Sequence, residues 1–299
     1  MQRKSFFILL MVVFLTTVLL GGCGASPGTQ ETAQTNTITL GGSSTLAPII
    51  AECADGFMEE FKTWNHVDPS FPEEAIVIFV STGGSGFGVR STLDGTFDIG
   101  LVARDLREQE ETDLAEGRVL KLASDVLTIA VNPNNPLTSV KTDLTRDEIR
   151  DIFSGAIKTW NQLDASLPNT PIVLAIRDLG GGASEIFDAA VMHGTPVSDE
   201  AQQMPSMGAL GAKVMENDAA IGYVSSGLVN QNPDKLVALS VDGIAPTLEN
   251  INQGVYDIGR PLLLIAKSNF TPQQQAFIDY LQSEKGHQVI SNLGYIPAE

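Results

Sequence analysis

Short apolar runs rich in β-branched residues alternate with amphipathic stretches along most of this sequence. This alternation is typical of an α/β fold, in which strands build a sheet and amphipathic helices cover its faces. Thr271 and Pro272 are residue types that favour the start of a helix, so they predict where the last long helix begins. The pattern predicts strands at 37–40, 75–80, 97–101, 127–131, 172–176 and 261–266, and helices at 46–62 and 272–283, with 89–93 as part of a short helix.

The length of the chain predicts two lobes. About 260 residues follow position 36, which is more than one typical hydrophobic core accommodates. The strands at 127–131 and 261–266 flank the central part of the chain, so the chain could cross to a second lobe along one and return along the other. We expect two hinge strands, a ligand cleft between the lobes, and these boundaries: a first lobe of residues 37–126 plus 264–299 and a second lobe of residues 127–263.

The first residues have the pattern of an export signal. Arg3 and Lys4 precede a nearly uninterrupted apolar run at 5–20, which is about as long as the apolar h-region of a secretory signal and short for a bilayer span. The sequence LGGC at 20–23 resembles the lipobox of bacterial lipoproteins, so Cys23 is the predicted lipidated N-terminus. A plain signal peptide with an incidental cysteine, or an N-terminal membrane anchor, are the alternatives.

These features predict an extracytoplasmic protein that is anchored to the cell membrane by an N-terminal lipid. Residues 1–22 would be the signal peptide and residues 23–36 the lipidated tether, because Gly, Ser, Thr and Gln without large apolar residues cannot bury a core. Only Cys53 remains once Cys23 is assigned, so no intramolecular disulfide is expected.

The acidic composition limits the partners. Loss of Arg3 and Lys4 changes the formal net charge from −18 to −20. Nucleic acid is therefore not an expected partner, because it is also an anion. A small anionic ligand would need a local set of hydrogen-bond donors to overcome the negative field of the protein. The three histidines lack metal-ligand spacing, and no serine, cysteine or paired carboxylates form a catalytic pattern. We therefore expect a protein that is not an enzyme and has no metal and no cofactor, and we also expect a monomer.

Three segments rich in glycine and hydroxyl residues each join a predicted strand to a predicted helix. They are GGSST at 41–45, STGGSGFG at 81–88 and RDLGGGAS at 177–184. Glycine lets the backbone approach a ligand, the first amides of a helix point outward with partial positive charge, and one arginine adds a bidentate cationic donor. Together the three segments predict a site for a small oxyanion.

The order of several motifs resembles the phosphate-binding proteins of ABC uptake systems. The similarity spans essentially the whole chain after the tether, and it implies a two-lobed type II periplasmic-binding-protein fold. It also implies that the chain captures phosphate or a related tetrahedral oxyanion and delivers it to the membrane permease subunits of an ABC importer. The motifs are GSSTLAP (42–48), GGSGFGVR (83–90), DGTFDIG (94–100), VNPNNP (131–136), IFSG (152–155) with TW (159–160), AIGY (220–223) and GYIP (294–297).

The resemblance assigns ligand contacts to positions within the three glycine-rich segments. Further candidates beside them are Ser43, Ser184 and Asp98. Members of the family usually carry serine at position 181, threonine at position 183 and aspartate or serine at position 103, where this chain has Gly181, Ala183 and Ala103. Up to three side-chain contacts are therefore missing. The positions carried over are Ser44, Thr45, Ser85, Arg177, Gly181, Gly182 and Ala183.

Selectivity between oxyanions depends on an acceptor for a proton. Phosphate keeps a proton at neutral pH and sulfate has none, so a carboxylate would favour phosphate. With Ala103 at the family's acceptor position, Asp98, Asp105 or Asp178 would have to serve, and we expect Asp98 to be structural. Arg104 is expected to pair with a carboxylate or brace the cleft.

Two other classes of function are open. The substitutions at positions 103, 181 and 183 are compatible with a ligand-sensing or surface interaction module that keeps the scaffold with an altered ligand. An extracellular hydrolase would need a nucleophile and a base that the sequence does not display.

Overall fold

The computed structural model describes residues 37–179 and 181–298, and it confirms the α/β class. The predicted signal peptide, Cys23 and the tether lie outside the described residues. A ten-stranded mixed sheet runs through the described part of the chain. Along it lie β2 (Val77–Thr82), β1 (Thr37–Gly42), β3 (Ile99–Val102), β11 (Gly259–Ala266), β4 (Arg118–Val131), β8 (Ala220–Ser225), β6 (Val173–Arg177) and β7 (Gln202–Met204), in that order.

The strand pairing is parallel in the outer parts of the sheet and antiparallel at its centre. In the first lobe β2, β1 and β3 are parallel, and in the second lobe β8, β6 and β7 are parallel. The two central strands, β11 and β4, are antiparallel to each other. Short strands complete the pairing: β9 (Val237–Ala238) and β12 (Ile296–Pro297) pair with β4, and β5 (Asp143–Leu144) pairs with β10 (Ser240–Val241).

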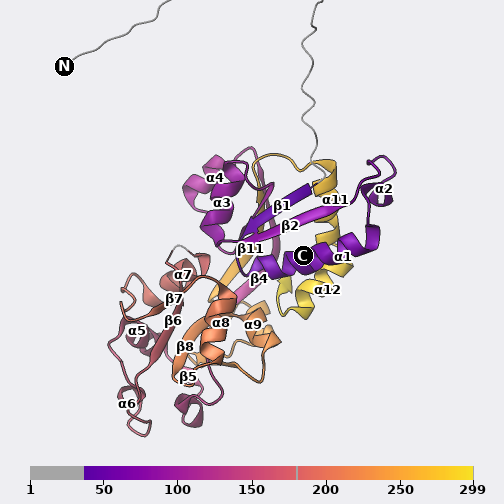
Figure 1. The fold of residues 1–299 in the computed structure, drawn as a ribbon. Helices are drawn as coiled ribbons and strands as arrows, with labels where there is room; N and C mark the ends of the chain where they lie inside the picture. Colours follow the sequence, from indigo (N-terminus) through magenta and orange to yellow (C-terminus); the bar gives the residue numbers. More distant parts are fainter. Residues whose placement is uncertain (1–36, 180, 299) are drawn as a thin grey trace, which may run out of the picture. The chain divides into compact units, whose positions relative to one another are not determined.

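The long strand β4 connects the two lobes. Its residues up to Val126 pair with β11, and its residues from Leu127 on pair with β8. The chain returns beside this crossing, because Gly259 pairs with Val126 and the Leu127 N–H donates to the Ile258 carbonyl at 2.8 Å. Two neighbouring crossings therefore join the lobes, as Figure 1 shows around the labels β4 and β11.

Each lobe has its own hydrophobic core. Phe57 contributes to the first core, where its ring contacts those of Trp64, Phe277 and Tyr280. In the second core the ring of Phe187 stacks on Tyr223 with centroids 4.2 Å apart. A small third cluster lies on the other face of the first lobe's strands, under α3 (Ser85–Leu93) and α4 (Glu108–Asp113).

The remaining helices divide between the lobes. Those of the first lobe are α1 (Leu46–Phe61), α2 (Trp64–Val67), α11 (Pro272–Leu281) and α12 (Glu284–Asn292). Those of the second are α5 (Arg146–Ser154), α6 (Trp160–Leu163), α7 (Gly182–Phe187), α8 (Met207–Met215), α9 (Ser226–Gln231) and α10 (Leu248–Asn252), with the single turns η1 (Pro136–Ser139) and η2 (Asp188–Met192). Among the described residues, no helix combines the length and the apolar composition that a membrane span requires.

The predicted elements are all present, with different ends. Thr271 caps α11 by accepting from the Gln274 N–H at 3.3 Å, and Pro272 is the first residue of that helix. The predicted helical segment 89–93 is the second half of α3, which begins at Ser85 because Gly84 turns the chain at φ +84° and Gly88 allows close packing. A Cβ on Gly88 would lie only 2.7 Å from the Leu101 carbonyl of β3.

The lobe boundaries expected from the sequence, 37–126 plus 264–299 and 127–263, stay a prediction. Residues Leu262 and Leu264 pack in the first core, and Ile258 packs in the second. This packing favours a return crossing just before β11, rather than in its middle.

Candidate functional site

The three glycine-rich segments do join strands to helices. They lead from β1 to α1, from β2 to α3 and from β6 to α7. One hydrogen bond and one close approach of the backbone bring them together across the lobes. The Arg177 Nη1 donates to Ser44 Oγ at 3.0 Å, and a Cβ on Gly182 would lie 2.7 Å from Ser85 Oγ and 2.9 Å from the Ala103 carbonyl.

Arg177 is held firmly at the end of β6. Its residue is 3% exposed. Its Nε donates to the Met204 carbonyl and its Nη2 to the Pro205 carbonyl, both at 3.1 Å, and Nη2 also donates to the Asp178 carboxylate. With the bond to Ser44, these contacts use four of the five guanidinium N–H groups, so within the described residues one N–H of Nη1 is left for a ligand.

Ser44 receives a second hydrogen bond that the sequence did not predict. The Met207 N–H, at the start of α8, donates to Ser44 Oγ at 3.1 Å. The only sequence signal for this helix start is Ser206, whose hydroxyl caps α8 by accepting from the Ala209 N–H at 3.0 Å. Ser44 and Thr45 line a cavity of about 260 Å³, which Met207 and Ser206 also line.

Ser85 and Thr45 are buried acceptors of protein N–H groups. The Ala103 N–H donates to Ser85 Oγ at 3.0 Å, and the Arg260 Nη2 donates to Thr45 Oγ1 at 3.0 Å. Each hydroxyl has one hydrogen and is an acceptor in these contacts. The hydroxyl hydrogens of Ser85 and Thr45, like that of Ser44, are therefore available to donate to an anion.

The sequence predicted that the first amides of the helix after the first segment would be free to bind an anion, but Ser43 accepts hydrogen bonds from them. Its buried hydroxyl accepts from the N–H groups of Thr45 and Leu46 at 3.2 and 3.4 Å, and its carbonyl accepts from the Ala47 N–H at 3.0 Å. The first amides of α1 are thus bonded within the loop, and Ser44 and Thr45 present hydroxyls instead.

Asp98 and Ser184 also make internal contacts. Asp98 Oδ2 accepts from both the N–H and the hydroxyl of Thr39 at 2.7 Å, which ties β3 to β1. Ser184 Oγ lies 2.9 Å from the Asp178 carbonyl, to which it donates, and 3.0 Å from the Tyr223 hydroxyl. Burial raises the pKa of Tyr223, whose oxygen also accepts from the Arg177 N–H at 3.0 Å.

At the start of α7 the backbone offers two amides. The Gly181 N–H donates to the Asp178 carbonyl at 2.9 Å and closes the turn. Gly182 and Ala183 are the first two residues of α7, where N–H groups have no partner within the helix. Ala183 packs in the second core, so its small side chain faces away from the other two segments.

Arg104 forms ion pairs, as expected. Its buried guanidinium pairs with Glu110 at 2.7 Å and, across the lobes, with Glu185 of α7 at 3.3 Å. Arg107 pairs with the same Glu185. Burial alone would raise the pKa of Glu110, but its hydrogen bonds to Arg104 and Arg107 lower that pKa overall.

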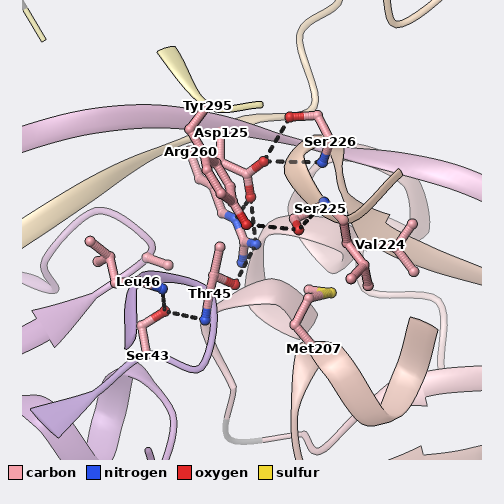
Figure 2. Close-up of polar contacts among 12 residues, drawn as sticks. Ser43, Thr45, Leu46, Asp125, Met207, Val224, Ser225, Ser226, Arg260 and Tyr295 are labelled. Carbon is pink, nitrogen blue, oxygen red and sulfur yellow. Dashed lines mark hydrogen bonds and ion pairs between the residues drawn. The ribbon is translucent and has the colours of Figure 1, made fainter. Parts of the chain in front are cut away.

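A buried ion pair between Arg260 and Asp125 contacts Thr45, and the sequence did not predict it. Arg260 Nη2 and Asp125 Oδ2 are 2.7 Å apart, and the side chains are 1% and 0% exposed. Asp125 Oδ1 accepts from the Ser226 N–H and hydroxyl at 3.2 and 3.0 Å. Figure 2 shows Arg260 between Thr45 and Asp125, with Ser226 on the far side of the carboxylate. Burial raises the pKa of Asp125, and Arg260 opposes that effect.

Comparison with known proteins gives consistent similarities. A model of the PBP superfamily domain matches residues 27–285. The phosphate-binding protein PstS of Bacillus subtilis strain 168 is 28% identical, over 99% of this chain and 94% of its own length. A Clostridium perfringens substrate-binding protein solved with bound phosphate has a TM-score of 0.75 at 28% identity, covering 88% of this chain and 100% of that one. An ABC-type phosphate transport receptor from Vibrio cholerae has a TM-score of 0.66 at 27% identity, covering 87% and 100%.

Proposed function

The chain belongs to the PBP superfamily and has its type II two-lobed fold, and from this premise we propose that it captures inorganic phosphate for an ABC importer. The similar proteins are named for phosphate binding or phosphate transport. In this proposal the protein carries phosphate to the permease subunits without changing it chemically. It acts outside the cytoplasm as a monomer, held to the membrane by a lipid on Cys23.

The observation that carries this proposal is the direction of the hydrogen bonds made by hydroxyl groups in the glycine-rich segments. Ser44, Thr45 and Ser85 each accept from a protein N–H, so each keeps its hydroxyl hydrogen for an anion. The proposed contacts add one N–H of Arg177 and the amides of Gly182 and Ala183, with Gly181 beside them. Such a set of donors suits a small oxyanion, because hydrogen bonds to a charged acceptor are stronger than those to a neutral one.

Asp178 is the proposed acceptor for the proton of phosphate. Asp98 is bonded to Thr39, and Asp105 lies outside the three glycine-rich segments, whereas Asp178 lies within the third. The Asp178 carboxylate accepts a hydrogen bond from Arg177, and it would lie 3.1 Å from a Cβ on Gly181. It therefore lies close to the start of α7. A carboxylate there would repel sulfate, which has no proton to donate.

The test is the thermal unfolding midpoint of the full chain, titrated separately with phosphate, sulfate, molybdate and arsenate. A ligand that binds only the folded protein stabilises it by RT ln(1 + [L]/Kd), which is about 2.7 kcal/mol at one hundred times Kd. We expect phosphate to raise the midpoint at micromolar concentration and sulfate to leave it unchanged. If none of the four anions shifts the midpoint, the proposal is wrong and a sensing or surface interaction module is the better explanation.

A further inference from the structure

The guanidinium of Arg260 contacts two side chains that belong to different parts of the molecule. Its Nε and Nη2 donate to Asp125 Oδ2 at 3.0 and 2.7 Å, and Nη2 also donates to Thr45 Oγ1 at 3.0 Å. Arg260 follows the return crossing, and Asp125 lies just before the outgoing crossing on β4. Arg260 and Asp125 are 135 residues apart in sequence. Through Arg260, the pair links the point where the lobes join to Thr45 of the first glycine-rich segment.

The bond to Thr45 fixes what that hydroxyl can do. A guanidinium has no acceptor, so Thr45 Oγ1 must be the acceptor in this contact and its own hydrogen must point to another group. Thr45 lines the 260 Å³ cavity, and Arg260 and Asp125 line a separate cavity of about 1180 Å³. Arg260 and Thr45 thus line different cavities, and a hydrogen bond joins them. A charged donor also polarises the O–H bond, which strengthens the hydrogen bond that it donates onward.

Asp125 keeps Arg260 in this position. The carboxylate is fully buried, and its second oxygen accepts from the N–H and hydroxyl of Ser226 in the second lobe. Because Asp125 neutralises Arg260, the pair adds little net positive charge to the cleft. Orientation of the Thr45 hydroxyl, and not long-range attraction, is what the pair supplies.

We propose that Arg260 is a positioning residue for phosphate binding: held by Asp125, it fixes the Thr45 hydroxyl as a donor to the bound oxyanion. The inference rests on the proposed function, since it names how one donor of that site is set. It predicts that the ion pair affects phosphate affinity through Thr45 and through no other donor of the site.

The experiment is a double-mutant cycle on the full chain, with Kd for inorganic phosphate measured by calorimetry. Removal of Arg260 alone would leave a buried unpaired carboxylate, so the pair is replaced together by Asp125→Leu with Arg260→Met. Thr45→Val removes the hydroxyl and keeps the shape. We expect Thr45→Val to raise Kd about tenfold or more, and the pair replacement to raise Kd by a similar factor. In the Thr45→Val background, the pair replacement should add no further loss.

The same pair replacement in a Ser85→Ala background is the control, and there its effect should remain in full. An equal rise in Kd in the presence and absence of the Thr45 hydroxyl would overturn the inference, as would an unchanged Kd in the otherwise native chain. If the pair replacement does not fold, Arg260→Lys provides the same cycle, because lysine keeps the charge but lacks the planar fork. Failure of the native chain to bind phosphate would instead contradict the proposed function.

Discussion

Ser85 and Ser184 are both small hydroxyl side chains beside the candidate site, yet their hydrogen atoms have different partners. Ser85 Oγ accepts from the Ala103 N–H and keeps its hydrogen, whereas Ser184 Oγ donates to a carbonyl of its own turn. We expect Ser85→Ala to weaken phosphate binding, because a hydrogen bond to a charged group contributes about 1.5 to 3 kcal/mol, or about 10- to 150-fold in Kd. Calorimetric titration with phosphate measures this loss.

Ser184→Ala is the matched control at the same scale. It should lower the thermal midpoint slightly, because it removes the contacts with Asp178 and Tyr223, but it should leave the phosphate Kd nearly unchanged. A large loss of affinity in Ser184→Ala with none in Ser85→Ala would show that the directions of the two hydrogen bonds have been misassigned.

These residues also mark how far the sequence could predict the site. Ser44, Ser85 and Arg177 stand in segments whose glycines and hydroxyls already indicate an oxyanion site, and the structure brings those segments together. Arg260 and Met207 could not be predicted, because their contacts with Thr45 and Ser44 depend on how distant parts of the chain fold together. Local pattern identifies the loops, and tertiary contacts decide which way each hydroxyl points.

Among the elements, the start of α7 packs directly against the first lobe. Gly182→Ala would place a methyl group 2.7 Å from Ser85 Oγ and 2.9 Å from the Ala103 carbonyl, which is closer than carbon contacts allow. We expect this substitution to hinder closure of the lobes, and to weaken phosphate binding by about tenfold or more, since overpacking typically costs about 1 to 3 kcal/mol. The phosphate Kd and the unfolding midpoint without ligand are the two measurements.

Gly208→Ala tests whether any methyl group in the cleft has this effect. Gly208 lies in the first turn of α8, where a Cβ would meet only Ser206 Oγ at 3.9 Å. Alanine favours the helix more than glycine does, so this variant should keep its affinity and be slightly more stable. Equal loss of binding in both variants would count against the close approach of α7 as the cause.

The central strands show why element boundaries were harder to predict than element types. The sequence predicted a strand at 127–131, but β4 begins nine residues earlier at Arg118. The earlier part contains Lys121 and Asp125, which interrupt the apolar pattern that identifies a strand. Lys121 is exposed, and Asp125 is buried with Arg260 and Ser226 as partners of its carboxylate. A buried charge cannot be predicted before its partner is known.

For the molecule as a whole, ion pairs across the lobes add to the contacts that a ligand would make. Arg104 and Arg107 of the first lobe both pair with Glu185 of the second. Arg104 is almost fully buried, whereas Glu185 is 30% exposed and Arg107 is 59% exposed, so solvent ions reach part of this cluster. These pairs stabilise the arrangement in which the lobes meet, and salt should weaken them.

Glu185→Gln should therefore release phosphate faster without touching any proposed ligand contact. We expect the dissociation rate to rise about three- to tenfold at low salt, the range for loss of two ion pairs to a carboxylate that solvent partly reaches. This effect should shrink at about 1 M salt, where the screening length is only about 3 Å. Stopped-flow release of phosphate at both salt concentrations measures it.

Glu200→Gln is the control, because Glu200 pairs with Lys158 at 3.5 Å within the second lobe. A wild-type rate for Glu185→Gln at low salt, or the same acceleration at both salt concentrations, would rule out a role of the cross-lobe ion pairs in retaining the ligand.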